Sequence, residues 1–310
     1  EFTIGYKGNF NALKYAVDFN GTFIRNEVVN VAGDSIYRGD VGVNLRNICL
    51  TAEGYPMSQF NGLKTDGLFT WADAAVKPNG DVYIWNQPYT IKANGDTAYA
   101  QPKAKPGDLR YVDVNHDGVI NNFDKVNIGN PIPKFYFGFS ANIEYKNFDL
   151  NLFFEGKLGH KIFNGSKFYL MSQDPGPNKL KDVLNQYREP IYDNEGNLLY
   201  EGNTHTDLPR LDPKADNGNF TRISDFYVEN GSYVRLKNIQ IGYTIPGKIS
   251  EKVGIEKLRI YAGAKNLLTI TKYSGFDPEF ANSDLLSQGI DKIGNYPQSL
   301  VLLAGLNLTF

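Results

Sequence analysis

This 310-residue sequence has few cysteines, few histidines and no long hydrophobic run. Its single cysteine, Cys49, cannot form an internal disulfide bond, and we interpret it as an inert thiol. No stretch approaches 18 consecutive apolar residues, which excludes a transmembrane helix. The 32 Lys and Arg residues nearly balance the 34 Asp and Glu residues, so the charge gives no indication of nucleic-acid binding.

The motifs of common enzymes are also missing. The three histidines, His116, His160 and His205, show no metal-binding spacing, and no GxSxG, P-loop or HExxH motif occurs. Carboxylates are plentiful, but no pair stands out as a general acid and base. We therefore expect no enzymatic activity.

The C-terminal strand carries the clearest pattern in the sequence. Side chains alternate between the faces of a β-strand, so Gly305, Asn307 and Thr309 fall on a face that is largely polar. The opposite face is an apolar stripe of Leu300, Leu302, Ala304, Leu306, Leu308 and Phe310. The C-terminal Phe310, with Leu308 and Gly305 before it, resembles the terminal assembly signal of bacterial outer-membrane β-barrels. The alternative is a soluble sandwich that ends in Phe.

The same alternation recurs along the chain and predicts seven strands. Barrel strands conceal their hydrophobicity in alternation, so a mean hydropathy of −0.39 is compatible with a membrane barrel. The phase slips near Lys237 and Asn238, which predicts a β-bulge. The seven stripes span Phe2–Tyr6, Tyr15–Phe23, Phe135–Tyr145, Phe148–Leu158, Ile239–Ile245, Leu258–Ala264 and Leu300–Phe310.

The connections between these stripes alternate in length. Short connections cover about 8–13, 146–147 and 246–256, and long ones cover about 32–134, 164–225 and 273–296. Bacterial barrels have short periplasmic turns and long extracellular loops, so we expect the long segments and Glu1 to lie outside the cell. Single-chain bacterial barrels have an even number of strands, and an open edge is not tolerated in lipid. Seven strands therefore predict the C-terminal piece of a larger barrel, with an N-terminal part and signal peptide missing before Glu1.

Motifs in the long segments add specificity. They span nearly the whole chain, and their order resembles the C-terminal portion of SusC/RagA-type TonB-dependent outer-membrane transporters. The motifs are Gly54-Tyr55-Pro56, Phe60-Asn61-Gly62, Thr65 to Phe69, Lys105 to Asp108, Asp113 to Ile120, Ile128 to Pro131, Val228 to Ile239, Asn266-Leu267, Tyr273 to Glu279 and Asn295 to Gln298.

The resemblance implies an all-β fold. Residues 1–310 would be an antiparallel segment of a transmembrane barrel, about seven of 22 strands, with long extracellular loops. It also implies a Gram-negative outer-membrane protein that imports glycan fragments or peptides with energy from TonB. A SusD-like surface lipoprotein would be its partner, and lipid would surround it. The family's plug domain and TonB-interacting segment lie outside these 310 residues.

One loop has the spacing of a calcium site. The run from Asp113 to Asp124 places oxygen ligands as an EF-hand-like loop does, with Gly at the sixth position. Position 12 is Asp rather than Glu, and an ordinary turn held by its own Asx hydrogen bonds is the alternative. The candidate ligands for Ca²⁺ are Asp113, Asn115, Asp117, the carbonyl of Val119, and Asp124.

Aromatic residues in the first long segment are candidates for substrate binding. Trp71, Tyr83, Trp85 and Tyr89 could stack on sugar rings, although such residues more often pack a loop's own core. The function has two alternatives to import. One is a secreted calcium-dependent carbohydrate-binding or adhesion module, and the other is a small outer-membrane hydrolase barrel.

Overall fold

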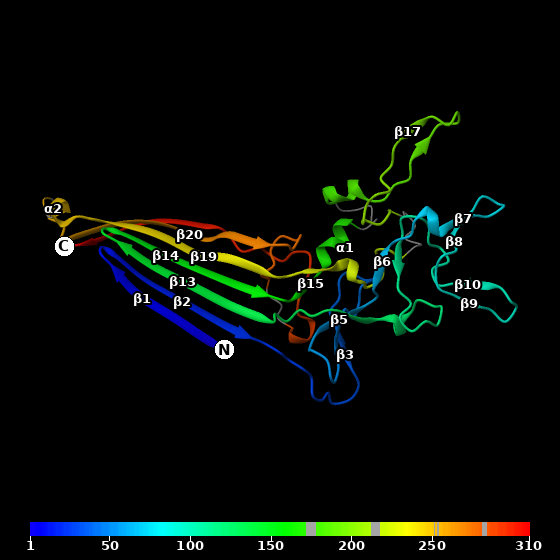
Figure 1. Cartoon of the computed structure of the whole chain (residues 1–310), viewed down its shortest axis with the longest axis horizontal. Coiled ribbons are helices and arrows are strands. Elements are labelled where there is room, and N and C mark those ends of the chain that lie inside the picture. Colours follow the sequence, from blue (N-terminus) through cyan, green and yellow to red (C-terminus); the bar gives the residue numbers. More distant parts are fainter. Residues whose placement is uncertain (172–177, 212–217, 251, 253, 281–283) are drawn as a thin grey trace.

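The computed structural model describes residues 1–171, 178–211, 218–250, 252, 254–280 and 284–310. The molecule is elongated, with a long β-sheet at one end and a region of folded loops at the other (Figure 1). Within the described residues, no helix has the length and apolarity needed to cross a membrane.

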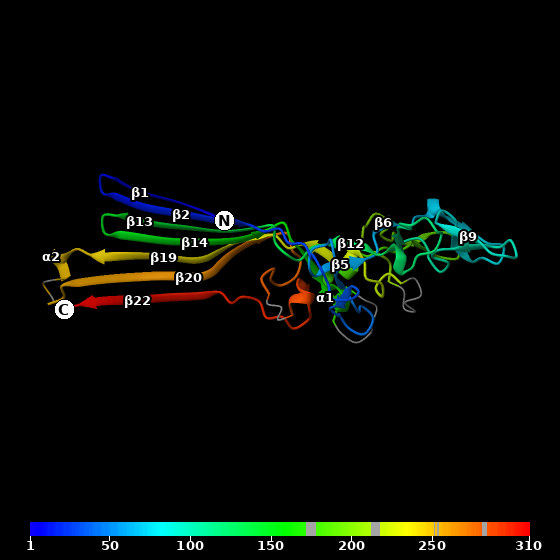
Figure 2. The ribbon, with the colours of Figure 1, turned by 90° about the horizontal axis from the view of Figure 1, so that it is seen from below.

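Seven long strands form the sheet, and each is antiparallel to its neighbours. Their order across the sheet is their order along the chain, which confirms the seven predicted strands. The sheet is open, with β1 and β22 at its edges (Figure 2). The strands are β1 (Phe2–Phe10), β2 (Leu13–Phe23), β13 (Phe135–Tyr145), β14 (Phe148–Leu158), β19 (Tyr233–Ile245), β20 (Lys257–Thr271) and β22 (Val301–Thr309).

The register gives the sheet one apolar face and one polar face. Phe139 lies opposite Phe19 on one side and Phe154 on the other, whereas Asn142 lies opposite Asn151. Because side chains alternate between the faces, this register continues each apolar stripe into the next strand. Aromatic rings pair across strands on the apolar face, for example Phe23–Phe135, Phe139–Phe154 and Phe148–Tyr243.

The predicted bulge is present in β19, where Phe153 of β14 pairs with Asn238 and the next residue, Phe154, pairs with Leu236, so Lys237 is the extra residue. A second irregularity lies between β19 and β20. Leu236 pairs with Leu268 and Asn238 with Lys265, so Lys237 faces two residues of β20. Asn266 takes up the irregularity with a left-handed φ of 54°, a conformation that Asn tolerates. The extra residue on β20 resets its alternation, so the strand continues to Thr271, beyond the predicted end of the stripe at Ala264. β1 also extends beyond its predicted stripe, to Phe10 rather than Tyr6, in unbroken register with β2.

Short and long connections lie at opposite ends of the sheet (Figure 1). The short ones are the two-residue turns at 11–12 and 146–147 and the connection that contains α2 (Gly247–Ser250). The long ones are residues 24–134, 159–232 and 272–300, which we call the first, second and third segments and together the loop region. This arrangement confirms the predicted alternation, and the C-terminus lies at the end with the short turns.

The loop region contains small sheets and short helices of its own. The first segment holds β3 (Ile36–Arg38), β4 (Cys49–Thr51), β5 (Gln59–Gly62), β6 (Thr65–Leu68), η1 (Trp71–Asp73), β7 (Ala74–Val76), β8 (Val82–Ile84), β9 (Tyr89–Ile91), β10 (Thr97–Tyr99), β11 (Leu109–Tyr111), η2 (Asn122–Asp124) and β12 (Val126–Gly129). The second holds β15 (Lys161–Asn164), α1 (Gly165–Met171), η3 (Lys181–Asn185), β16 (Ile191–Tyr192), β17 (Leu198–Tyr200), η4 (Asp225–Tyr227) and β18 (Val228–Asn230). The third holds η6 (Leu285–Ser287) and β21 (Ile290–Asp291).

One hydrophobic core joins all three segments. Phe60 of the first segment, Phe163 of the second and Ile290 of the third are completely buried together. A parallel pairing between β15 and β21 brings Phe163 beside Ile290. Cys49 lies in the same core, and burial raises the pKa of its thiol to about 11, so the thiol is protonated at neutral pH.

Candidate functional site

The polar face of the sheet carries most of the charged side chains of the seven strands. Their charged groups lie on the side away from the aromatic stripe and do not form an arrangement of catalytic groups. A polar lining of this kind is suited to a water-filled passage. The side chains on this face include Lys14, Asp18, Asn20, Asn142, Glu144, Asp149, Asn151, Glu155, Gln240 and Arg259.

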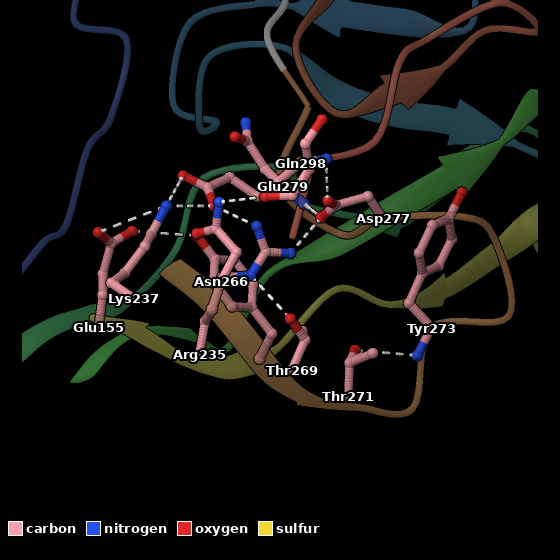
Figure 3. A network of polar contacts seen from close by, with 12 residues as sticks. Glu155, Arg235, Lys237, Asn266, Thr269, Thr271, Tyr273, Asp277, Glu279 and Gln298 are labelled. Carbon is pink, nitrogen blue, oxygen red and sulfur yellow. Dashed lines mark hydrogen bonds and ion pairs between the residues drawn. The ribbon is translucent and has the colours of Figure 1, made fainter. Parts of the chain in front are cut away.

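An ion-pair cluster, which we call the Arg235 network, lies where this face meets the loop region (Figure 3). Arg235 of β19 is only 2% exposed and uses all three of its guanidinium nitrogens. Nε donates to Thr269 Oγ1 at 2.8 Å, Nη1 to Glu279 Oε2 at 2.8 Å and Nη2 to Asp277 Oδ1 at 2.5 Å. Thr269 belongs to β20, whereas the two acids belong to the third segment, so Arg235 connects the sheet to a loop.

Lys237 and Asp277 extend the network. The Lys237 ammonium donates to both carboxylate oxygens of Glu279, at 2.8 and 2.7 Å, and lies 4.0 Å from Glu155. Asp277 also accepts from the backbone N–H groups of Glu279 and Gln298, at 2.8 and 2.7 Å. Because Gln298 lies near the end of the third segment, one carboxylate fixes both the beginning and the end of that segment to the sheet (Figure 3).

Further contacts order the third segment and hold it to the second. Within the third segment, the Tyr273 hydroxyl donates to Asp291 at 2.5 Å, and burial together with this carboxylate raises the tyrosine pKa. Ser274 donates from its backbone and its hydroxyl to Glu229 of β18, both at 2.9 Å. The third segment is therefore held both to the sheet and to its neighbouring segment.

Charge pairs also occur at the opposite end of the polar face. Arg259 donates to both oxygens of Asp149, with Nε at 2.8 Å and Nη2 at 2.5 Å. Lys14 and Glu144 are 3.8 Å apart with side chains 68% and 63% exposed. The first pair has bidentate geometry and the second is an ordinary surface contact.

Sequence reasoning did not find the Arg235 network. Arg235 and Asp277 both lie in motifs that carried the family resemblance, and this is the available signal, because Arg235 itself fits the polar face of a regular strand. The partner lies 42 residues away, and a single sequence gives no measure of such a pairing.

The buried acids of the predicted calcium loop accept hydrogen bonds from the backbone. Asp113 accepts from the N–H of Gly118 at 2.8 Å. Asp124 accepts from the N–H groups of Val114 and Asn121, at 2.9 and 2.8 Å. These are charge-assisted bonds that hold the loop closed.

The tip of the same loop is exposed. Asn115 and Asp117 bond to each other at 2.9 Å, and Asp117 accepts from the N–H of Val119 at 2.9 Å. In the part of the chain that is described, no group of three or more His, Cys, Asp or Glu residues is arranged to hold a metal ion. The structure thus shows a hydrogen-bonded turn, and calcium binding by this loop stays a prediction.

The predicted aromatic residues lie at the far end of the loop region. Trp71 and Trp85 are about half exposed. Tyr83 and Tyr89 each contact Tyr99, with ring centroids 6.0 and 6.3 Å away, although Tyr89 is also more than half exposed. Trp71 donates through Nε1 to Glu189 at 2.8 Å. Sugar binding by these four residues stays a prediction.

The three residues of the predicted assembly signal lie on or beside β22. Gly305 pairs with Tyr261 of β20, whose ring occupies the space where a Cβ would be. Leu308 pairs with Leu258 on the apolar face, and Phe310 is 83% exposed. Packing alone therefore also explains a glycine at position 305, because the ring of Tyr261 leaves no room for a side chain there.

Comparison with known proteins decides the family. The chain is 30% identical over 320 residues to TonB-dependent receptor P3 of Formosa agariphila, a match covering 100% of this chain and 28% of that receptor. It is 27% identical over 223 residues to TonB-dependent receptor SusC of Bacteroides thetaiotaomicron, covering 70% of this chain and 19% of SusC. The chain belongs to the TonB-dependent receptors of the SusC/RagA type. No protein-family model matches it.

A solved structure agrees with this TonB-dependent receptor segment in fold. The RagAB peptide transporter superimposes with a TM-score of 0.64 at 21% identity, covering 99% of this chain and 29% of that one. The match supports a barrel wall segment, and the segment spans about 28% of the length of receptor P3, corresponding to the C-terminal part of the family. TonB-dependent receptors are outer-membrane proteins and not enzymes, which confirms the predicted outer-membrane class and the expectation that the protein is not an enzyme. The extracellular position of the long segments stays a prediction. The family also disfavours a secreted adhesion module.

Proposed function

We propose that the full-length protein imports glycan fragments or peptides across the outer membrane and that this chain forms about seven of its 22 barrel strands. The division of the sheet into an apolar and a polar face carries the proposal. One face offers aromatic and aliphatic side chains to outer-membrane lipid, and the other offers amides and ion pairs to water. A wall between hydrocarbon and an aqueous passage needs both.

The long segments would lie outside the cell. Their length, their position at one end of the sheet and the family resemblance support this orientation. There they would receive the substrate and seat a SusD-like lipoprotein over the barrel mouth. The relatives include SusC and a transporter described as a peptide transporter, which supports an oligomeric nutrient as the cargo.

This chain would bind and guide the substrate without making or breaking a bond in it. The Arg235 network would keep the third segment against the barrel wall, beside the passage. The energy would come from TonB through the N-terminal part of the full-length protein.

Genetic complementation tests the proposal. A strain that lacks the full-length gene receives either the wild-type gene or one without the TonB-interacting segment, and growth is measured on glycan fragments or on peptides as the sole carbon source. We expect the wild-type gene to restore growth on one of these classes and the shortened gene to fail. Import would be contradicted if the deletion strain, the strain with the wild-type gene and the strain with the shortened gene all grew equally on glycan fragments and on peptides.

The partner is tested by purification. The full-length receptor, extracted in mild detergent through an affinity tag, should retain a SusD-like lipoprotein in a stable complex. Recovery of the receptor alone from cells that express both proteins would remove this part of the proposal.

A further inference from the structure

A cavity of about 290 Å³ lies in the loop region, between the first and second segments. Three cationic side chains line it, namely Arg46, Lys125 and Arg222. Leu63 and Ile223 contribute apolar parts of the wall. We call this cavity the Arg222 pocket. It shares no residue with the Arg235 network or with the predicted calcium ligands, although Asn122 and Lys125 flank Asp124 in the sequence.

The cations of the Arg222 pocket form no ion pair with any carboxylate of the described residues. Arg46 donates through Nε to the carbonyl of Val43 at 3.2 Å, and the Arg222 guanidinium lies 5.1 Å from the ring centroid of Tyr111. Lys125 and Arg222 are half-buried, whereas Arg46 is exposed. Burial removes part of the hydration of a cation, so a nearby anion would stabilise Lys125 and Arg222.

The acids nearest in sequence do not supply the missing charge. Asp124 directs both carboxylate oxygens to the backbone N–H groups of Val114 and Asn121. Asp225 accepts from the N–H and the hydroxyl of Thr65, at 3.0 and 2.7 Å. No acidic side chain lines the pocket in the described part of the chain. Among the described residues, all charged side chains of the wall are therefore positive.

Neutral donors complete the lining. Asn44, Asn122 and Thr221, whose side chains can donate hydrogen bonds, also line the pocket. A guanidinium offers a fixed fork of N–H donors that fits two oxygens of a sulfate, phosphate or carboxylate, and an ammonium adds a compact charge. An oxyanion in the pocket would neutralise the mutual repulsion of the three cations and restore the hydrogen bonds that burial removes.

We propose that the Arg222 pocket binds an oxyanion group: sulfate, phosphate or carboxylate. A second step rests on the proposed function. If the full-length protein imports oligomers, the oxyanion is a substituent of the cargo, and the pocket makes the importer prefer anionic oligomers to neutral ones. The first step stands independently of transport.

Equilibrium dialysis tests the first step. The full-length receptor in detergent is dialysed against radiolabelled sulfate and, separately, radiolabelled phosphate at low ionic strength. We expect one saturable site in the wild type and at least a tenfold loss of affinity in Arg222→Gln and Lys125→Gln. Lys92→Gln, a lysine of the same segment outside the pocket, should bind as the wild type does. Wild-type receptor that binds neither ion, or pocket variants that bind both ions unchanged, would overturn the site.

Two controls keep the variants interpretable. Thermal unfolding of each variant is compared with that of the wild type, because Arg222 also packs on Tyr111. Lys125 has no such contact, so loss of binding in Lys125→Gln with unchanged unfolding supports the site by itself. Retained binding in a stably folded Lys125→Gln variant counts against it.

Competition separates the sources of the oxyanion. A sulfated tetrasaccharide and an acidic tetrapeptide are tested against maltotetraose and a neutral tetrapeptide for displacement of labelled sulfate and for uptake by cells. Displacement by an anionic oligomer, with Arg222→Gln reducing only its uptake, supports the second step. Displacement by none of the oligomers restricts the pocket to free ions and overturns that step. Saturable sulfate binding without uptake of any oligomer would reject the import function and leave the pocket intact.

Discussion

The sheet and the loop region are held together in opposite ways. All four buried hydrophobic clusters of the described residues belong to the loop region, including the cluster around Phe60 and Phe163. The sheet instead presents apolar side chains outward, such as Phe10, Phe23 and Leu302, each more than 70% exposed. The loop region has its own core, whereas many apolar side chains of the sheet are exposed in the described part of the chain.

This difference indicates that the loop region and the apolar face of the sheet contact different solvents. The loop region follows the ordinary rule for a folded domain in water, with apolar residues inside and charges paired or exposed. The sheet follows the rule for a barrel wall, in which hydrocarbon takes the place of a core on one face. Among the largest fully buried side chains, the sheet contributes Arg235 and Tyr233, both where the two regions meet.

The largest effect is expected where the two regions are joined. Arg235→Ala leaves Asp277, which is 7% exposed, without its cation, and leaves Glu279 paired with Lys237 alone. Removing one partner of a buried ion pair lowers the free energy of unfolding by about 3–5 kcal/mol. We expect hydrogen exchange of residues 276–280 and 298 in the full-length receptor to accelerate strongly.

A surface pair on the sheet provides the control. Lys14→Ala breaks the exposed contact with Glu144 and should cost less than about 1 kcal/mol. Arg235→Lys should give an intermediate effect, because one ammonium cannot reproduce the three-way guanidinium contact. Equal exchange in Arg235→Ala and Lys14→Ala would show that the network does not hold the third segment.

A charge on the apolar face tests the assignment of the two solvents. Leu152→Arg or Phe139→Arg would place a cation in hydrocarbon, at a cost of about 2–4 kcal/mol near the membrane midplane. The same substitution at Asn151 or Asn142, which face the other side, should be far milder. Stability is measured by urea unfolding of the full-length receptor in lipid vesicles, and equal losses on both faces would mean that the faces are reversed or equivalent.

The sheet could be predicted from sequence and the loop contacts could not. Alternation of single residues is a local signal, and it identified all seven strands and the bulge at Lys237. Pairings over long separations leave no such trace, so Arg235 with Asp277, and Phe163 beside Ile290, were not foreseen. The Arg222 pocket was missed for the same reason, since its lining comes from residues far apart in sequence.

Phe310 tests how the wall is assembled. If it belongs to the assembly signal, its deletion from the full-length protein should lower the amount of receptor in the outer membrane while synthesis continues. Leu300→Ala, at the other end of the same stripe, is a matched control and should have little effect on insertion. Surface labelling and whole-cell immunoblots measure the two quantities, and unchanged surface levels after deletion would count against the signal.

The smallest effect is expected at the Asp113 loop. Joint replacement of Asp113, Asp117 and Asp124 by Asn should loosen this loop and leave the barrel folded, because these carboxylates hold the loop's own backbone. If the loop also binds calcium, chelation of the wild type should loosen residues 113–124 and weaken a lipoprotein contact. Hydrogen exchange of residues 113–124 with and without calcium distinguishes a calcium site from a hydrogen-bonded turn. If exchange becomes faster in the substituted protein but does not change on chelation, the loop is an ordinary turn.

Accessibility along one strand tests the central claim that the two faces of the sheet meet different solvents. Single nitroxide labels at positions 150–154 of β14, in the full-length receptor with Cys49→Ser, are reconstituted in lipid vesicles. Collision with dissolved oxygen reports hydrocarbon, and collision with a water-soluble nickel chelate reports the passage. The account predicts high oxygen accessibility at the even positions and high nickel accessibility at the odd ones. Uniform accessibility along the strand, or the reverse alternation, would contradict it.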